Sequence, residues 1–532
     1  MGIREELARA VAEGRVADRE ELERLKRQLA ARDRLPRVPT DADILAAMGD
    51  DVPEESRALL RTKPSRSLSG VTVVAVMTPP SSCPHGRCAY CPGGVEEGTP
   101  QSYTGKEPAA RRGERADYDG GAQTADRLGQ LRGAGHPVDK VELVIMGGTF
   151  PAMEGTERDE FVRGCLDMMN GAPSADLHAA IDANEDAPHR CVALTLETRP
   201  DLCDPPGVDS LLAMGATRVE IGVQVTEDAP LRIVGRGHGV AESVSATRNL
   251  KDAGLKVGYH LMLGLPGMSP EEDLRALERV IDDPSFRPDL LKLYPTLVME
   301  GTELHRWWAE GKYTPLDEEG AVGILAAFKA RLPPWVRVSR VERDIPSNLI
   351  AAGIRASNLR QLVADRMRAD GTRCRCIRCR EVGRRGPERL EAFGASHEVD
   401  PDEVEVVSTV YDASGGREAF LVLELPEHDA IVGYARVRDP SGEAWRHELE
   451  GAAVLREIRV LGEALPLGGP PGGGGLSWQH RGLGRRLLEE AELTTVGWGR
   501  DRLAVTAGMG TRGYFRTMGY SLAGPYMVRD LE

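Results

Sequence analysis

Short apolar segments recur between Val71 and Pro295 and set the main pattern of the chain. Most are continuous aliphatic runs, as expected for strands that are buried on both faces of a sheet. The segments between them are long enough for helices, and repeated β–α units require parallel strands. The pattern therefore predicts an α/β fold, a partial (βα)6 barrel whose site lies in the loops after the strands. The six predicted strands are residues 71–77, 141–146, 192–196, 219–223, 257–264 and 290–294.

The pattern changes after Val404, where four longer segments favour antiparallel strands. A Gly/Pro tract at 468–475 follows, and a helix is predicted to begin near Gly482. We expect a mixed α/β domain here. The predicted regions are 1–66, charged helices with a basic end that either contact RNA or pack against the fold; 67–330, the partial barrel; 331–400, a basic linker; and 401–532, the mixed domain.

Composition limits the classes of protein that this chain can be. Its 532 residues exceed one ordinary domain, and 41% apolar residues suffice for buried cores. The chain has no run of eighteen apolar residues and no signal-peptide core at its start, so we expect a cytoplasmic protein with no membrane segment. A net charge of −15 argues against nucleic-acid binding by the whole surface.

One region has the opposite charge. From Arg331 to Arg389 the chain holds fifteen arginines, no lysine and six acids, around the triplet Cys374, Cys376 and Cys379. A solvated face is the ordinary explanation for a charge run, but the cysteines favour an RNA-binding surface fixed by a structural zinc ion. Three thiolates leave the fourth zinc ligand open, and His397 is one candidate.

A second triplet, Cys83, Cys88 and Cys91, follows the first predicted strand with the spacing C-x4-C-x2-C. Three thiolates in a loop can hold a 4Fe–4S cluster with one open iron. A zinc site completed by His85 is equally compatible with the spacing alone. The place of the loop favours the cluster, because catalytic loops of β–α barrels follow the strands.

The second strand also ends in a suggestive sequence, Gly147-Gly148-Thr149, which lets backbone approach a ligand closely. Together with the cysteine loop, this resembles the radical S-adenosylmethionine (SAM) superfamily. The resemblance implies that the open iron binds SAM, whose cleavage gives a 5′-deoxyadenosyl radical. The four residues between the first two cysteines depart from the usual three. Glu197 and Gln224, at the ends of strands three and four, are candidate SAM contacts or polar plugs of the barrel.

The sequence QHRGLG at 479–484 opens the helix predicted in the last domain. Backbone N–H groups at such a turn bind phosphate. After four antiparallel strands, this resembles the GNAT acetyltransferases, and the resemblance implies acetyl-CoA binding. Glu457, in LREIRV, is a candidate base or a partner of its neighbour Arg456. The implied acetyl-CoA contacts are Gln479, Arg481, Gly482, Gly484, Arg485, Tyr514 and Phe515, with Tyr514 also a candidate proton donor to the CoA sulfur.

Several motifs occur in one order: CPHGRCAYC, GGTF, ETRPD, LKLYPTLVMEGTEL, CRCIRCRE and the GNAT turn. That order resembles the family of Elongator catalytic subunits, in its stand-alone prokaryotic form, from about residue 65 to the end. The resemblance implies that the radical removes hydrogen from the methyl group of acetyl-CoA and that the resulting carbon adds to carbon 5 of the wobble uridine in a tRNA anticodon loop. Oxidation and thioester hydrolysis then leave 5-carboxymethyluridine.

The same resemblance makes Lys292 and Tyr294 candidate catalytic residues; an ordinary salt bridge is the alternative for Lys292. It also implies that the two cofactor sites face each other across one cleft, and that acetyl-CoA turnover depends on tRNA. A homodimer is compatible with the motifs, and no motif identifies the electron donor. Two other functions stay open, a protein lysine acetyltransferase with a structural cluster and a non-catalytic tRNA-binding factor.

Overall fold

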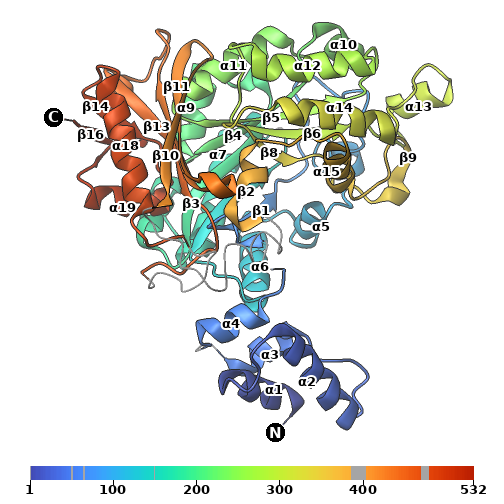
Figure 1. The fold of residues 1–532 in the computed structure, drawn as a ribbon. Helices are drawn as coiled ribbons and strands as arrows, with labels where there is room; N and C mark the ends of the chain where they lie inside the picture. The colour runs from blue at the N-terminus through green and yellow to red at the C-terminus, as the bar shows by residue number, and fades with distance from the viewer. Residues whose placement is uncertain are drawn as a thin grey trace.

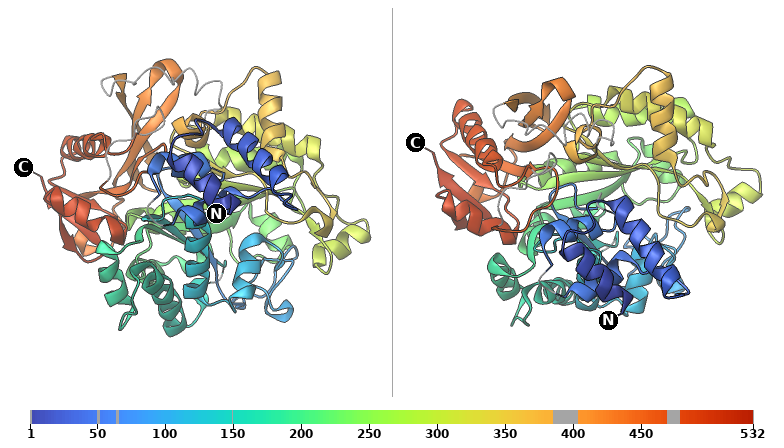
Figure 2. Two further views of the ribbon diagram at one scale, coloured as in Figure 1. Left: turned by 90° about the horizontal axis from the view of Figure 1, so that it is seen from below. Right: turned by 60° about the horizontal axis from the view of Figure 1, so that its bottom comes forward.

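The computed structural model describes residues 2–49, 52–63, 66–148, 150–384, 403–468 and 478–531. Figure 1 shows a lobe of N-terminal helices below a larger body that holds two sheets. Figures 1 and 2 place the C-terminal sheet on one side of this body, and helix α13 (Glu303–Ala309) on the opposite side.

The first sheet is a parallel half-barrel, which confirms the predicted fold class. Its strands follow chain order, and every neighbouring pair is parallel. The strands are β1 (Thr72–Met77), β2 (Lys140–Met146), β3 (Arg190–Thr198), β4 (Arg218–Gln224), β5 (Lys256–Leu263), β6 (Leu290–Pro295) and β8 (Arg337–Arg340). The first six are the predicted strands; β8 was not predicted, because its sequence RVSR has no apolar run.

Helices cover the outer face of the half-barrel, where apolar side chains from strands and helices form the largest core of the described chain. The covering helices are α6 (Gly120–Gly133), α7 (Gly155–Asn170), α8 (Leu177–Ala183), α9 (Pro205–Ala213), α11 (Val240–Asp252), α12 (Pro270–Asp282), α14 (Glu318–Arg331) and α15 (Leu359–Ala369). Because this face takes the apolar residues of each strand, the inner face is free to carry polar ones.

The second sheet is mixed and has its own core, as expected for the last domain. Its strands pair antiparallel except β13 with β14, which run parallel. In sheet order they are β10 (Glu405–Ala413), β11 (Gly416–Leu425), β12 (Ala430–Asp439), β13 (Ala452–Val460), β14 (Arg502–Val505), β16 (Tyr526–Asp530) and β15 (Ser521–Ala523). Helix α18 (Leu483–Gly497) packs Leu487 and Leu488 into this core, and the short α19 (Arg512–Thr517) follows β14.

The N-terminal lobe forms a separate small core. Arg61 joins it to the body, through an ion pair with Glu463 and a 3.0 Å hydrogen bond to the carbonyl of Gly135. Its helices are α1 (Ile3–Ala12), α2 (Arg19–Arg32), α3 (Asp41–Met48) and α4 (Glu54–Leu60). The remaining elements are α5 (Pro108–Arg115), α10 (Asp228–Ile233), α13, α16 (Ile377–Arg380) and the paired strands β7 (Val298–Met299) and β9 (Ile350–Ala352). Among the described helices, none combines the length and the apolar character that crossing a bilayer requires.

Buried ion pairs hold the second sheet against the amino ends of the barrel strands. Arg456 of β13 donates to both oxygens of Asp289, just before β6, at 2.7 and 2.8 Å. Arg438 of β12 contacts Asp252 at 2.6 Å and Glu418 at 3.0 Å. All five side chains are almost completely buried. Charges this deep are tolerated only when they are paired, so the ion pairs fix how the two parts fit together.

Replacing one of these carboxylates is expected to destabilise the fold. Glu418→Gln removes the charge that faces Arg438, Arg456 and Lys251. Breaking a buried pair costs about 3–5 kcal/mol, so the thermal midpoint should fall by several degrees. The matched control is Asp530→Asn, which breaks an exposed pair with Arg502 and should leave the midpoint unchanged. Equal midpoints for both variants would contradict a stabilising role of the buried cluster.

The same cluster gives the wild type an acid-sensitive stability. Burial alone would raise the pKa of Glu418, but Arg456 and Lys251 outweigh it and lower the pKa from 4.5 to about 2. A lowered pKa contributes stability that is complete above pH 4.5 and is lost as the pH falls toward 2. We expect the thermal midpoint of the wild type to drop more steeply than that of Glu418→Gln over this range.

Candidate active site

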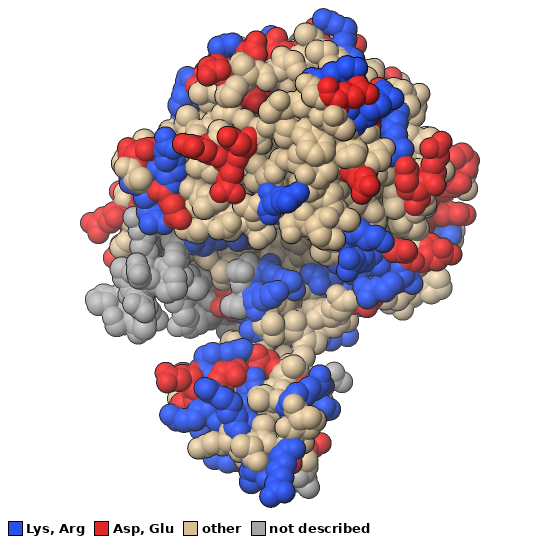
Figure 3. All heavy atoms as spheres, turned by 90° about the vertical axis from the view of Figure 1, so that its right-hand side faces the viewer, with Lys and Arg blue, Asp and Glu red and all other residues tan. Residues whose placement is uncertain are grey.

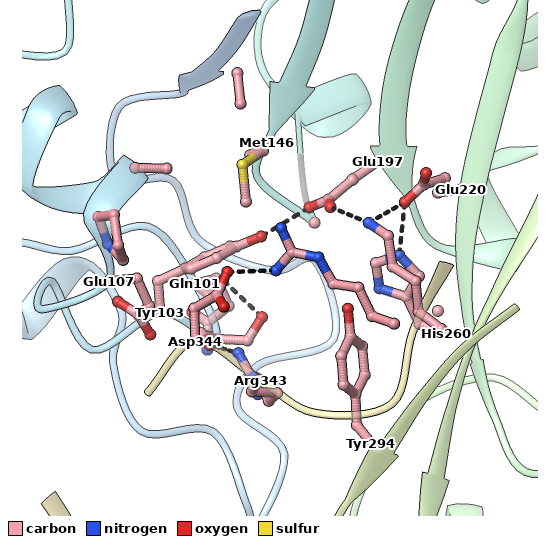
Figure 4. A pocket seen from close by; sticks show the side chains of 18 of the residues that line it. Gln101, Tyr103, Glu107, Met146, Glu197, Glu220, His260, Tyr294, Arg343 and Asp344 are labelled. Atoms are coloured by element: carbon pink, nitrogen blue, oxygen red, sulfur yellow. Dashed lines mark hydrogen bonds and ion pairs between the residues drawn. The ribbon is translucent and has the colours of Figure 1, made fainter. Parts of the chain in front are cut away.

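A cavity of about 520 Å³ occupies the inside of the half-barrel. It reaches from Thr72, at the amino end of β1, to Cys83 and Cys91 in the loop beyond its carboxyl end. Figure 4 shows charged and aromatic side chains pointing into this space. The predicted residues that line it are Cys83, Cys91, Gly148, Glu197, Gln224, Lys292 and Tyr294. The structure therefore brings most of the predicted SAM site together.

The cysteine loop is built around a buried guanidinium. Cys88 and Cys91 are buried and Cys83 is half-buried. Arg236 donates to the sulfur of Cys88 at 3.9 Å and to the carbonyl of Gly222 at 2.9 Å. Among the described residues, no carboxylate forms an ion pair with Arg236. Because a buried unpaired cation is costly, this position favours an anionic group on the three sulfurs, and a cluster held by thiolates is such a group.

A buried lysine joins two carboxylates inside the cavity. The ammonium of Lys292 contacts Glu197 at 3.4 Å and also Glu220 on the neighbouring strand β4. His260 lies 2.9 Å from Glu220, and the hydroxyl of Tyr103 donates to Glu197 at 2.9 Å. Ligand atoms of Glu197, Glu220 and His260 lie within 4.8 Å of one another, close enough for a metal ion. The Lys292 ammonium already contacts both carboxylates and supplies the cation there.

The electrostatics keep this lysine charged. Burial opposes the charge of Lys292, but the carboxylates of Glu220 and Glu197 outweigh it and raise its pKa. Burial would likewise raise the pKa of Glu197, yet the Lys292 charge lowers it. Burial raises the pKa of Tyr294, so its hydroxyl stays protonated. The cavity thus presents a fixed ammonium and a neutral phenol, and the predicted salt bridge of Lys292 exists inside the candidate site rather than apart from it.

Two residues of the predicted SAM site, Gly147 and Gln224, have positive φ angles. Gly147 has φ +144°, and a side chain there would collide with Thr78. Gln224 has φ +71°, in the left-handed region, at the cavity wall. Such strained positions in residues other than glycine are typical of functional sites. The backbone N–H of Gly147 donates to Glu197 at 3.3 Å, so this loop and the charged cluster are connected. Thr149 lies outside the described residues.

The predicted phosphate turn opens helix α18, as the glycine pattern indicated. Gly482 is the residue before the helix, with φ +80°. The side chain of Gln479 accepts from Lys140 at 2.5 Å and donates to the carbonyl of Gly70 at 3.0 Å, so it braces the turn against the barrel. Arg481 lies near the ring of Trp478, with 5.8 Å from its guanidinium carbon to the ring centre.

Tyr514 and Phe515 occupy different environments although they are neighbours. Tyr514 is 39% exposed, and a side chain added at Gly484 would lie 3.3 Å from its hydroxyl. Burial raises the pKa of Tyr514, and the charge of Arg485, which lowers this pKa, is the weaker effect. Phe515 is buried in the core of the second sheet, beside Tyr520. The structure therefore brings Tyr514 to the phosphate turn and places Phe515 in the core.

Glu457 belongs to the ion-pair network and is poorly suited to act as a base. It accepts from Arg436 at 2.9 Å and from the hydroxyl of Tyr434 at 3.1 Å. Burial would raise its pKa, but Lys256 and Arg436 lower it to about 2. A base works best with a pKa near the working pH. The predicted alternative, a surface pair with Arg456, also differs from the structure, because Arg456 is buried and pairs with Asp289 and Glu418.

The two predicted cofactor sites lie toward opposite ends of β1, and one cleft shared by both stays a prediction. Gln479 contacts Gly70, before the strand, whereas Cys83 follows it. Six residues at about 3.3 Å each separate these ends by roughly 20 Å. The reason is that the ion pairs hold the second sheet at the amino ends of the strands. The cavity runs along β1 and spans this separation.

A row of side chains with alternating positive and negative charge also connects the two ends of the barrel strands. Arg459 of β13 contacts Glu142 of β2 at 3.0 Å, and Glu142 contacts Arg218 of β4 at 2.6 Å. Arg218 contacts Glu220 at 3.3 Å, and Glu220 contacts Lys292. Each of these side chains is at most 15% exposed. The second domain is thus connected by contacts to the charged group in the cavity.

The other cysteine triplet forms a compact group at the edge of the barrel. The sulfurs of Cys374, Cys376 and Cys379 lie within 4.8 Å of one another. A tetrahedral zinc ion with Zn–S of about 2.3 Å spaces its sulfurs by about 3.8 Å, so the triplet suits one ion. In the described chain the sulfurs of Cys83, Cys88 and Cys91 do not all lie within that distance of one another. His397 lies outside the described residues.

Most arginines of the basic run at 331–389 form ion pairs. Arg337 pairs with Glu381, and Arg380 pairs with Glu424 and Asp429. Two others, Arg340 and Arg343, line the cavity, where Arg340 also pairs with Asp344 at 2.6 Å. Sequence reasoning missed these two roles, and it missed Tyr103, Glu220 and His260. The signal for the last two was a polar residue inside an otherwise apolar strand, as in RVEIGVQ and KVGYHLML.

The half-barrel with a three-cysteine loop after its first strand defines a protein of the radical SAM class. Family profiles match the ELP3 N-terminal domain over residues 2–68, the Radical SAM superfamily over 77–280 and the Radical SAM C-terminal domain over 288–369. The chain is 42% identical to a tRNA uridine(34) acetyltransferase of Methanocaldococcus infernus, over 99% of this chain and 98% of that relative. It is 40% identical to Elongator complex protein 3 of Homo sapiens, over 96% and 93% of the two chains.

A solved structure of a relative is also similar to this chain. The archaeal Methanocaldococcus infernus Elp3 with an N-terminal deletion (1–46) matches with a TM-score of 0.75 and 41% identity, over 87% of this chain and 100% of that chain. The chain belongs to the family of tRNA uridine(34) acetyltransferases and Elongator complex proteins 3.

Removing the buried ammonium tests whether the cavity charges are mutually dependent. Lys292→Met leaves Glu197 and Glu220 buried without their shared cation, and we expect a loss of about 3 kcal/mol in unfolding free energy. The double variant Lys292→Met/Glu197→Gln should recover part of it, because Glu197 forms no other ion pair in the described chain, whereas Glu220 keeps Arg218. Lys312→Met, at an exposed pair with Glu310, serves as control. A double variant less stable than Lys292→Met would refute this account; thermal midpoints measure it.

Proposed function

We propose that the protein attaches a carboxymethyl group to carbon 5 of the wobble uridine in tRNA, with acetyl-CoA as the carbon source and SAM as the radical source. The observation that carries the proposal is one cavity that extends from the cysteine loop to the amino ends of the barrel strands, where the second domain docks. An acyltransferase of the radical SAM class needs both parts in one chain.

The radical SAM family implies SAM and a 4Fe–4S cluster. Cys83, Cys88 and Cys91 would hold the cluster, with the unpaired Arg236 as the nearby positive charge. Gly147, Gly148, Glu197 and Gln224 would contact SAM, together with Thr149 from the sequence pattern. When bound, the reduced cluster and SAM supply a 5′-deoxyadenosyl radical that removes a hydrogen atom.

Acetyl-CoA fits the turn at the start of α18. Gly482 and Gly484 leave room there, and free N–H groups at a helix start suit the diphosphate. Arg481 and Arg485 add positive charge beside them. Tyr514, whose hydroxyl lies beside Gly484, remains the candidate proton donor to the CoA sulfur. Gln479 and Phe515 would act indirectly, one by bracing the turn and the other from the core.

The cavity's own residues suit stabilisation of negative charge. Lys292 is held by two carboxylates and needs no rearrangement to face an oxygen of the acetyl group or of the uracil ring. Tyr294 can donate a hydrogen bond from its protonated hydroxyl. Preorganised donors of this kind act strongly where water is excluded. Glu457 serves in this proposal as a partner of Arg436 rather than as a base.

Transfer RNA is the macromolecular substrate that the relatives' names indicate. Figure 3 shows Lys and Arg side chains gathered at the waist between the N-terminal lobe and the body, on a protein whose net charge is negative. Arg340 and Arg343 line the cavity that opens near this region. A basic path on an acidic molecule directs an RNA strand to one place.

The test is anaerobic. The reconstituted enzyme is given reductant, SAM, bulk tRNA and acetyl-CoA labelled on the methyl group, and the nucleosides are analysed by mass. We expect labelled 5-carboxymethyluridine that requires SAM. Label found only on protein lysines, with or without SAM, would overturn the proposal in favour of a protein acetyltransferase.

Cys88→Ala should lower product formation at least a hundredfold and remove the iron, because a ligand of the cluster is lost. The matched control is Cys165→Ala, which changes a cysteine buried in the outer core. It should retain iron and activity. Product from Cys88→Ala at the control rate would exclude the triplet from the reaction.

We also propose a structural zinc ion at Cys374, Cys376 and Cys379, which the short distances between their sulfurs support. Cys376→Ser should lose about one zinc per chain and lower the thermal midpoint, since structural zinc contributes to folding stability. Cys165→Ala again serves as control. Equal zinc content in the two variants by mass spectrometry would reject the site.

A further inference from the structure

Three arginines from separate segments meet at the side of the barrel cavity. Arg66 precedes β1, Arg112 lies on α5, and Arg127 lies on α6. All three line the cavity, next to Val73 and Ala75 of the edge strand β1. Arg112 and Arg127 are half-buried, and Arg66 is exposed. None of them belongs to the basic run at 331–389 or to the predicted cofactor sites.

These arginines lack acidic partners. Within the described ranges, no carboxylate oxygen lies within 4.0 Å of any of the three guanidinium groups. Arg112 donates to the carbonyls of Pro108 and Ala75, each at 3.2 Å, and its Nε is buried without a partner. Arg127 has a 3.3 Å contact with the side chain of Gln130. Elsewhere in the fold, buried arginines such as Arg456 are neutralised by carboxylates.

Their charges also oppose one another. Burial, then the charges of Arg112 and Arg66, lower the pKa of Arg127 to about 10. Burial lowers the pKa of Arg112 as well; Asp126 counteracts it, while Arg115 and Arg66 add to it. A fold that keeps these three cations together without a described carboxylate in direct contact gives up stability there. Such a sacrifice is typical of a binding site for an anion that the protein itself does not supply.

The geometry favours phosphate as that anion. Guanidinium groups bind phosphate oxygens through paired hydrogen bonds, and several arginines together can surround one phosphate. Val73, 38% exposed although it lies on a barrel strand, gives an apolar surface beside the cluster on which a base can stack. The three arginines also line the same cavity as the charged group at Glu197 and Lys292.

We infer that Arg66, Arg112 and Arg127 form a phosphate-binding site at the side of the cavity, which holds a phosphodiester next to the nucleotide that enters the barrel. The inference rests on the proposed function, because that function brings an RNA strand to this cavity. Acetyl-CoA carries phosphate too, and the experiment separates the two sources.

The test compares Arg112→Gln and Arg127→Gln with Arg115→Gln. Arg115 is on the same helix as Arg112 but is exposed and does not line the cavity. Binding of an anticodon stem–loop RNA is followed by fluorescence anisotropy at several salt concentrations. Each of the first two variants should bind about tenfold more weakly and reduce the salt slope by about 0.7, the value for one single-stranded phosphate contact. Arg115→Gln should stay within about twofold of wild type.

The second arm measures binding of labelled acetyl-CoA to the same variants. Weaker acetyl-CoA binding with an unchanged RNA slope assigns the phosphate to acetyl-CoA and keeps the site. Unchanged binding of both ligands, or an equal loss in Arg115→Gln, overturns it. A wild type that forms product, with variants that bind normally, would reject this inference and leave the proposed function standing.

Thermal stability separates binding from a structural role. Because each substitution removes one of three mutually repelling charges, Arg112→Gln and Arg127→Gln should melt at or above the wild-type temperature. A lower midpoint together with weaker binding would show that these arginines support the fold rather than bind phosphate.

Discussion

The ion pair between Arg456 and Asp289 is the interaction on which the arrangement of the molecule depends. It joins β13 of the second sheet to the start of β6 in the barrel, at a depth where neither charge reaches water. Hydrophobic contact alone tolerates sliding, whereas a buried pair is favourable in one geometry and costly in every other. The second domain is therefore fixed on the amino ends of the barrel strands, and the position of the phosphate turn follows from that.

This placement shapes the chemistry available to the protein. In the proposed function a radical would form near Cys83 and a thioester would bind near Gly482, about the length of a strand apart, so one of the groups would have to move along the barrel. The inside of the barrel would suit such passage, because its wall combines charged and polar side chains with apolar ones while the main apolar core lies on the outer face. The row of ion pairs from Arg459 to Lys292 connects the second sheet with the charged group in the cavity. A change at one end of this row therefore alters the contacts of the side chains at the other end.

The sequence predicted those elements whose pattern depends only on residues that are neighbours in the chain. Continuous aliphatic runs identified the first six barrel strands, because helices cover the outer face of these strands. The glycines at 147 and 482 marked backbone conformations that no other residue adopts easily. The strand β8 was missed, since RVSR lacks an apolar run. Pairings such as Arg459 with Glu142 were also beyond reach, because they join residues more than three hundred positions apart. Glu457 was considered a base because its contacts with Arg436 and Lys256 follow from strand pairing and domain packing, which the sequence pattern does not show.

The docking surface also bears on how such a protein can be inherited. The face that β12 and β13 present to the barrel carries Arg436, Arg438 and Arg456, three guanidinium groups that are buried only because the other half of the chain covers them. A gene split between the two halves would expose charges of both signs on each fragment, with Glu418 and Glu457 beside these arginines and with Lys251 and Lys256 beside Asp252 and Asp289 on the barrel. Each half would be selected to keep its partner, so fusion in a single reading frame is the stable evolutionary state for this pair of domains.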